Sequence, residues 1–239
     1  MIARLLLCIF LLSAAGQCAD MTKEDSLVIF SIHDEFEKLV SDVADIRAVR
    51  EMLDVSKRKE KRTVQVAYVL GSMARLEIRS HATEGRMRAM ILHDGSNSWL
   101  LLPILGKRRV KEEDFLLQPL RWVSWALVDE RARVEGTESI NGRECWKLRL
   151  GRRTGYAHLH LWIDQQDLSA IQGQSVDYNG DTLSWKHADY RTVFKDYTFP
   201  FQTDTYRNGE HISIAKILEM DVNTGLDPEL FNLSTAKLK

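Results

Sequence analysis

Three Asn-Gly pairs divide the second half of this chain: Asn141-Gly142, Asn179-Gly180 and Asn208-Gly209. Each pair lies between runs in which apolar and polar residues alternate, which is the pattern of a strand with one buried face. Asn-Gly is the preferred pair for a two-residue hairpin turn, because a type I′ turn needs positive φ at both central residues. Asp94-Gly95 adds a fourth pair of the same kind. These features predict a long series of antiparallel hairpins.

The first eighteen residues have the pattern of a secretory signal peptide. Arg4 supplies the positive charge, Leu5–Leu12 form an apolar segment too short to span a bilayer, and small residues follow at Ser13–Ala19. We therefore expect residues 1–18 to be a signal peptide. We expect residues 19–239 to form a single domain in the periplasm, since no linker, low-complexity tract or fixed repeat divides them.

Cysteine usage is sparse. Cys145 is the only cysteine after Cys18, so packing rather than a disulfide framework must hold the core. A bacterial lipoprotein signal has a small residue directly before the lipidated cysteine. Gln17 is not small, so we expect Cys18 to carry no lipid.

The spacing of apolar residues changes along the mature chain. From Ser31 to Leu53 they recur three and four apart, which predicts a helix, and Ser31 with Asp34 resembles a capping box. From Val64 onward the period is two, which predicts strands. This alternation is interrupted between Lys111 and Glu130, resumes at Arg131 and continues beyond Ile212.

Composition and motifs exclude several classes of protein. The chain has 33 Lys and Arg against 34 Asp and Glu, and this balance argues against a nucleic-acid-binding protein. The sequence has no G-x-S-x-G elbow, P-loop, dinucleotide fingerprint or H-E-x-x-H motif. We therefore expect a non-enzymatic protein without a cofactor.

One pair of histidines has the spacing of metal ligands. His158 and His160 lie on one face of an expected strand, where they can chelate a metal, but no third ligand is evident from spacing. The ordinary alternative is an exposed strand face opposite Leu159 and Leu161. We favour that alternative and expect no metal.

The interrupting segment is the most apolar stretch of the mature chain. Its large side chains include Phe115, Leu117, Leu120, Trp122 and Trp125. The ordinary alternative is that they form core, because paired tryptophans usually mean buried bulk. The functional alternative is a movable helical cover over an apolar cavity on the concave face of the sheet.

Four stretches of the chain carry a resemblance. His93–Trp99, followed by Pro103, is similar to a D-G-x-x-x-W…P pattern, and Glu135–Leu148 is similar to a hairpin G-x-E-x-I-x-G-x-x-C/A-aromatic-x-L. The others are Leu161–Asp164 and the closing Phe199-Pro200 with Asp227 to Phe231. In this order the stretches resemble the LolA/LolB-like superfamily, specifically the group called outer-membrane lipoprotein-sorting proteins.

The resemblance implies an α+β fold that is mainly antiparallel β. The expected form is a curved, incomplete β-barrel of about eleven strands with helices covering the open side. It also implies an apolar cavity that carries lipoprotein acyl chains or other lipids across the periplasm. An inner-membrane transporter would be the donor and an outer-membrane protein the acceptor. In that family an arginine near the end of the second strand holds the lid closed, and Arg75 lies near that place but out of register.

These considerations give an expected lipid-binding site. The helical cover would contribute Phe115, Leu117, Leu120, Trp122 and Trp125, and strands would contribute the opposite wall, from Trp99, Leu101, Trp146 and Leu148. The basic run would meet lipid headgroups or an acidic partner, or would be a solvated loop; it comprises Lys107, Arg108 and Arg109. The alternative function is a periplasmic sensor or interaction module that uses the same half-barrel to bind a protein partner.

The signal-peptide pattern gives a first testable prediction. We expect the mature protein to begin between Gly16 and Asp20 and to carry no diacylglyceryl group, because Gln17 precedes Cys18. The intact mass of the protein purified from its native host measures this. A lipid-sized mass addition on an N-terminal Cys18 would contradict it.

Overall fold

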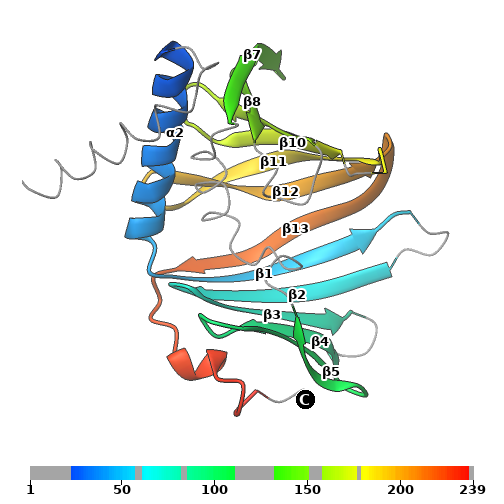
Figure 1. The fold of residues 1–239 in the computed structure, drawn as a ribbon. Helices are drawn as coiled ribbons and strands as arrows, with labels where there is room; N and C mark the ends of the chain where they lie inside the picture. The colour runs from blue at the N-terminus through cyan, green and yellow to red at the C-terminus, as the bar shows by residue number, and fades with distance from the viewer. Residues whose placement is uncertain are drawn as a thin grey trace, which may run out of the picture.

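A computed structural model of the chain describes residues 23–56, 61–81, 85–110, 132–150, 158–176 and 179–236. These residues form thirteen strands in one antiparallel sheet, with helix α2 (Lys23–Asp42) and the short 3-10 helix η3 (Pro228–Phe231). The sheet is strongly curved. Helix α2 crosses the strands of one half of the sheet, and η3 lies beside the other half (Figure 1). Among the described residues, no helix is both long and apolar enough to span a membrane.

The strands follow one another closely along the chain. The first six are β1 (Asp45–Asp54), β2 (Lys61–Leu70), β3 (Met73–Ser80), β4 (Met87–His93), β5 (Ser98–Leu102) and β6 (Gly106–Val110). The other seven are β7 (Arg133–Ile140), β8 (Arg143–Leu150), β9 (His158–Asp164), β10 (Ala170–Val176), β11 (Thr182–Phe194), β12 (Tyr197–Arg207) and β13 (Glu210–Val222). Their order in the sheet is β6-β5-β4-β3-β2-β1-β13-β12-β11-β10-β9-β8-β7.

One junction joins the two halves of this sheet. Every pair of adjacent strands in the described sheet is consecutive in sequence except β1 with β13. The buried carboxylate of Asp45, at the start of β1, accepts hydrogen bonds from the backbone N–H groups of Thr224 (3.0 Å) and Gly225 (2.8 Å). Asn223 adds a side-chain bond from its amide to the carbonyl of Asp42 (2.9 Å). Burial raises the pKa of Asp45, but these hydrogen bonds outweigh it and hold the pKa below its ordinary value.

The structure confirms that the fold is mainly antiparallel β and corrects two details. There are thirteen strands among the described residues rather than about eleven. The helix expected from Ser31 to Leu53 is wrong in its second half, because α2 ends at Asp42 and β1 begins at Asp45. The residues of β1 pair on both sides, with β2 and β13, and this long-range pairing overrides the local spacing of apolar residues. Ser31 lies inside α2 and donates to the carbonyl of Val28 (2.8 Å), so it is not the expected cap.

Two of the Asn-Gly pairs are the expected hairpin turns. Asn141-Gly142 joins β7 to β8 and Asn208-Gly209 joins β12 to β13, and all four residues have positive φ. Asn179-Gly180 lies between β10 and β11, where Gly180 has φ +88°. Asp94-Gly95 is not a two-residue turn, because four residues separate β4 from β5 and the Asp94 carboxylate accepts from the backbone of Ser96 and Asn97.

Apolar side chains form a separate cluster under each helix. On the side that we call the α2 face, the cluster contains Ile29, Ile32, Ala132, Leu148, Leu150, Leu159, Leu161 and Ile163. On the side that we call the η3 face, the cluster contains Met87, Met90, Leu92, Leu101, Phe231 and Ala236. Apart from a smaller third cluster of Cys145, Trp162 and Ile171, the described core is therefore divided between these two clusters.

These two clusters lie on opposite faces. Directly opposed residues of antiparallel strands point to the same face. A row of directly opposed residues runs from Leu161 on β9 across β10, β11, β12 and β13 to Asp54 on β1. Its intermediate members are Gly173, Trp185, Thr205 and Ser213. A second row of directly opposed residues runs from Met90 on β4 through Glu77 and Val66 to Val49, also on β1. Asp54 and Val49 are five residues apart in a strand that pairs regularly with β2, so they point to opposite faces.

The junction of β1 with β13 gives a prediction about stability. We expect Asp45→Ala to lower the free energy of unfolding by roughly 2–4 kcal/mol, because it leaves buried backbone N–H groups without their charged acceptor. Urea unfolding measures this. Asp221→Ala is the control, because Asp221 is exposed on the same junction. Its partner among the described residues is Arg47, in a surface ion pair worth up to about 1 kcal/mol. Equal losses in both variants would contradict the special role of Asp45.

Candidate functional site

The expected helical cover cannot be placed. Phe115, Leu117, Leu120, Trp122 and Trp125 all lie outside the described residues, as does the rest of the segment 111–131. The strand residues of the expected lipid-binding wall, Trp99, Leu101, Trp146 and Leu148, all lie within the described residues.

The structure does not bring the four wall residues together. Trp146 and Leu148 belong to the cluster on the α2 face. Trp99 and Leu101 belong to the cluster on the η3 face, where they pack near Phe231. The expectation of one common wall is therefore wrong. Its cause is the alternation of side chains along a strand, since a shift of one residue exchanges the two faces.

Arginines on the two faces have different partners. Arg75, on the η3 face, donates to the carbonyl of Leu230 (2.9 Å) and pairs with the buried carboxylate of Glu77 (2.5 Å). It therefore fixes the C-terminal segment and does not face α2. Arg50, on the α2 face of β1, was not identified from the sequence. Its Nε donates to Gln65 Oε1 on β2 (2.6 Å), and burial lowers the pKa of its guanidinium.

A second polar group lies on the α2 face, on β11. His187 is opposite Thr203 of β12, and its Nδ1 is 3.0 Å from the Thr203 hydroxyl. Burial lowers the pKa of His187 to about 4, so the ring is neutral near pH 7. Burial thus disfavours the charged forms of both Arg50 and His187, which lie on the same face of the curved sheet. We call this α2 face the inner face and the η3 face the outer face.

Close packing on the α2 face depends on one glycine. The indole of Trp185 lies directly over Gly173, where a Cβ atom would be 2.2 Å from its Cζ2 atom. Trp185 packs against the α2-face cluster from this position. Gly173 thus lets a large ring lie flat on the inner surface between β10 and β11.

The basic run forms part of the edge strand β6. Lys107 donates to the carbonyl of Leu233 (2.7 Å), and Arg109 donates to the side-chain oxygen of Asn97. Arg108 is opposite Leu100 on β5, and all three basic side chains are exposed. The run is therefore a strand rather than a loop, and whether it contacts headgroups stays a prediction.

The described part of the structure shows no metal site at the H-x-H pair. His160 Nε2 lies 3.1 Å from Glu135 Oε2, and the side chain of His158 is outside what the structure describes. Within the described ranges, no group of three or more His, Cys, Asp or Glu side chains is placed to hold a metal ion.

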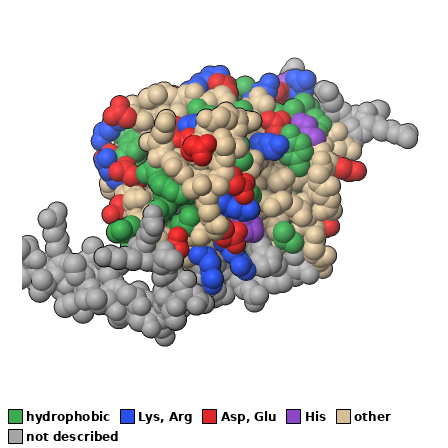
Figure 2. Space-filling model, turned by 90° about the horizontal axis from the view of Figure 1, so that it is seen from above, with side chains coloured by type: hydrophobic (Ala, Val, Ile, Leu, Met, Phe, Trp, Pro, Cys, Tyr) green, Lys and Arg blue, Asp and Glu red, His purple; other side chains and the backbone are tan. Residues whose placement is uncertain are grey.

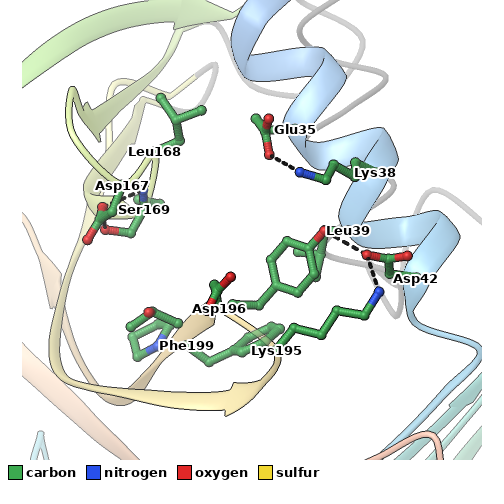
Figure 3. A pocket seen from close by; sticks show the side chains of 14 residues that line it. Glu35, Lys38, Leu39, Asp42, Asp167, Leu168, Ser169, Lys195, Asp196 and Phe199 are labelled. Atoms are coloured by element: carbon green, nitrogen blue, oxygen red, sulfur yellow. Dashed lines mark hydrogen bonds and ion pairs between the residues drawn. The ribbon is translucent and has the colours of Figure 1, made fainter.

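A pocket of about 430 Å³ opens at the C-terminal end of α2, beside the turns β9–β10 and β11–β12 (Figure 3). Lys195 reaches from the β11–β12 turn to Asp42 of α2, with 2.9 Å between Nζ and Oδ2 (Figure 3). A hydrogen bond from Lys195 is the main cause that lowers the pKa of Asp42, and a hydrogen bond from Tyr197 lowers it further. Charged side chains of both signs line this pocket together with the apolar Leu39, Leu168 and Phe199.

The molecular surface seen from above carries both signs of charge (Figure 2). In the view from above, acidic and basic side chains are interspersed, and apolar side chains gather mainly in one area beside the residues drawn in grey (Figure 2). This mixed surface agrees with the nearly balanced composition of the chain.

Comparison with known proteins places the chain in a family and a fold. Residues 77–237 match a family model described as "Uncharacterized protein". The chain belongs to that family. A search of curated proteins found no match.

Three solved structures are similar to this fold. An outer membrane lipoprotein-sorting protein domain from Vibrio parahaemolyticus has a TM-score of 0.65 at 15% identity, covering 83% of this chain and 95% of that one. A DUF1329 family protein from Desulfovibrio piger has a TM-score of 0.69 at 15% identity, covering 89% and 98%. A LolA superfamily protein from Nitrosomonas europaea has a TM-score of 0.59 at 12% identity, covering 84% and 97%. The LolA-like fold implied by the sequence resemblance is therefore confirmed.

The burial of His187 gives a prediction about pH. Its pKa of about 4 lies below the ordinary value of 6.5, so between these values the unfolded chain binds a proton that the folded protein does not. The free energy of unfolding should therefore fall as the pH is lowered through this window, by up to about 1.4 kcal/mol per pH unit. We expect His187→Gln to remove this part of the pH dependence.

Urea unfolding at about pH 7 and about pH 5 measures the effect. The control is His81→Gln, since His81 is largely exposed near Glu51. Identical pH dependence in the wild type and His187→Gln would contradict the burial of His187.

Proposed function

We propose that this protein is an exported, non-catalytic carrier that binds the acyl chains of lipids or lipoproteins on the α2 face of its sheet. The LolA-like fold supports the proposal, since one similar structure is described as a lipoprotein-sorting domain. The signal-peptide pattern of residues 1–18 supports a periplasmic location. An inner-membrane transporter and an outer-membrane acceptor would be its partners.

The observation that carries the proposal is the apolar inner surface. Away from the α2 cluster, this face still presents apolar side chains that are only partly buried, namely Ala48, Met52, Ala67, Leu76, Ile78, Leu100 and Ile217. They lie on β1, β2, β3, β5 and β13, and the buried Ile91 of β4 connects Leu76 of β3 with Leu100 of β5, so the apolar area extends across the middle of the sheet. An extended apolar area that is open to a ligand on a concave face is typical of a binding site.

The energetics of lipid transport explain why such a surface is useful. Burying an acyl chain is worth about 0.8 kcal/mol per methylene. A long chain is therefore held back from water by on the order of ten kcal/mol. A carrier that shields the chain allows it to cross an aqueous compartment without catalysis.

The segment with Phe115, Leu117, Leu120, Trp122 and Trp125 is proposed as the cover of this surface, because its composition is apolar and it interrupts the strands. Trp146 and Leu148 stay in the proposed site, since they lie on the α2 face. Trp99 and Leu101 leave it, since they face η3. The alternative of a sensor module gains no specific support from the described residues.

A binding experiment tests the proposal. We expect the double variant Met52→Gln/Ile78→Gln to bind a fluorescent acyl probe about tenfold more weakly, because loss of apolar contact worth about 1.4 kcal/mol corresponds to a factor of ten. Val64→Gln is the matched control, since Val64 is also a partly buried strand residue but lies on the η3 face. Its probe affinity should stay within about twofold.

Two outcomes would reject the proposal. One is that the wild-type protein binds no acyl probe. The other is that the outer-face control loses as much affinity as the inner-face variant. Unfolding curves for each variant show whether a loss of binding reflects a loss of folded protein.

A further inference from the structure

Two arginines of β1 lie three residues apart and face opposite sides of the sheet. Arg47 is on the η3 face, where it pairs with Glu219 (3.1 Å) and Asp221 (2.9 Å) of β13. Those hydrogen bonds raise its pKa. Arg50 is on the inner α2 face, and within the described ranges its side chain donates one hydrogen bond, from Nε to Gln65 Oε1. The outer arginine is neutralised by two carboxylates and the inner one by none that the structure describes.

Among the described residues, the immediate neighbours of Arg50 on this face are uncharged, and the charged pair Asp54 and Lys61 lies farther along β1 and β2. Its direct cross-strand neighbours are Gln65 on β2 and Ile217 on β13. The next positions on the same face are Ala48, Met52, Thr63, Ala67 and Ala215. The nearest charges along β11 on this side, Asp189 and Arg191, pair with each other at 2.6 Å.

Leaving a guanidinium in such surroundings is costly. A buried charge is normally paired, and burial here lowers the pKa of Arg50 while none of the described side chains is seen to pair with it as an opposing charge. The terminal amino groups of an arginine are a planar fork that matches a carboxylate or a phosphate in two parallel hydrogen bonds. A charge of this kind beside an apolar ligand surface is suited to the head of an amphiphile.

We propose that Arg50 binds the anionic headgroup of the lipid, a carboxylate or a phosphate, while the acyl chain lies on the apolar residues around it. This inference rests on the proposed carrier function and narrows its cargo. A free acidic lipid fits the site better than a lipoprotein, whose acyl groups are held in uncharged ester and amide bonds. Gln65 holds the guanidinium in place from the neighbouring strand.

The experiment compares three probes with the same chain and a fluorophore at the methyl end: a fatty acid, its methyl ester and the corresponding alkyl phosphate. We expect the wild-type protein to bind the two acidic probes about ten- to hundredfold more tightly than the ester, the range for hydrogen bonds to charged groups. Arg50→Met should reduce this ratio to near one while the affinity for the ester changes by less than about threefold.

Arg47→Met is the matched control, because it removes an arginine from the same strand but from the outer face; it should keep the wild-type ratio. Arg50→Lys keeps the charge but not the fork, and should give an intermediate ratio. If Arg50→Met does not fold, the comparison of the acid probe with the ester probe in the wild type and in Arg50→Lys still tests the headgroup site.

The outcomes separate the two proposals. Equal wild-type affinity for acid and ester, or an unchanged ratio in Arg50→Met, would overturn the headgroup site and leave the carrier standing. Failure of all three probes to bind would overturn both. Competition by inorganic phosphate alone at concentrations similar to those of the alkyl phosphate would show a site for the free anion, and would overturn the assignment to a lipid.

Discussion

The pairing of β1 with β13 is the interaction on which the described fold depends. Each other pairing in this sheet joins strands that are consecutive in the chain, so it can form locally. Only β1 and β13 bring together residues roughly at opposite ends of the domain, and such a contact must overcome a large loss of chain entropy. The hydrogen bonds of Asp45 and Asn223 fasten this junction where β1 begins and β13 ends. Without it the two halves would be separate half-sheets with no common inner surface.

The register of the strands also determines which side chains each face of the sheet presents. Because β1 pairs without a shift along β2, Arg47 and Arg50 must point to opposite sides. The outer face can then neutralise its charges with exposed carboxylates from β13. The inner face has apolar side chains, a neutral His187 and Arg50, for which the structure describes no carboxylate partner. A single antiparallel sheet thereby has one face with a buried cluster under η3 and paired surface charges, and another face on which we propose that an amphiphile binds.

Sequence reasoning reached the fold more fully than the site. The Asn141-Gly142 and Asn208-Gly209 turns were predictable, because their positive φ angles are a local property of those residues. The start of β1 was not predictable, because the local spacing of apolar residues there also fits a helix. The long-range pairing with β13 is what makes this segment a strand. Trp99 was assigned to the wrong face, since a face follows from the register rather than from residue type. Arg50 was missed for the same reason, because nothing in the local sequence separates it from Arg47.

The central claim is that the inner face of this sheet holds a lipid. The most direct measurement is mass spectrometry of lipids extracted from the protein after purification from its native host. The account predicts an acyl lipid in near-stoichiometric amount, with the same preparation of the Met52→Gln/Ile78→Gln variant depleted of it. A wild-type preparation that contains no acyl lipid, or the same amount as the variant, would contradict the account.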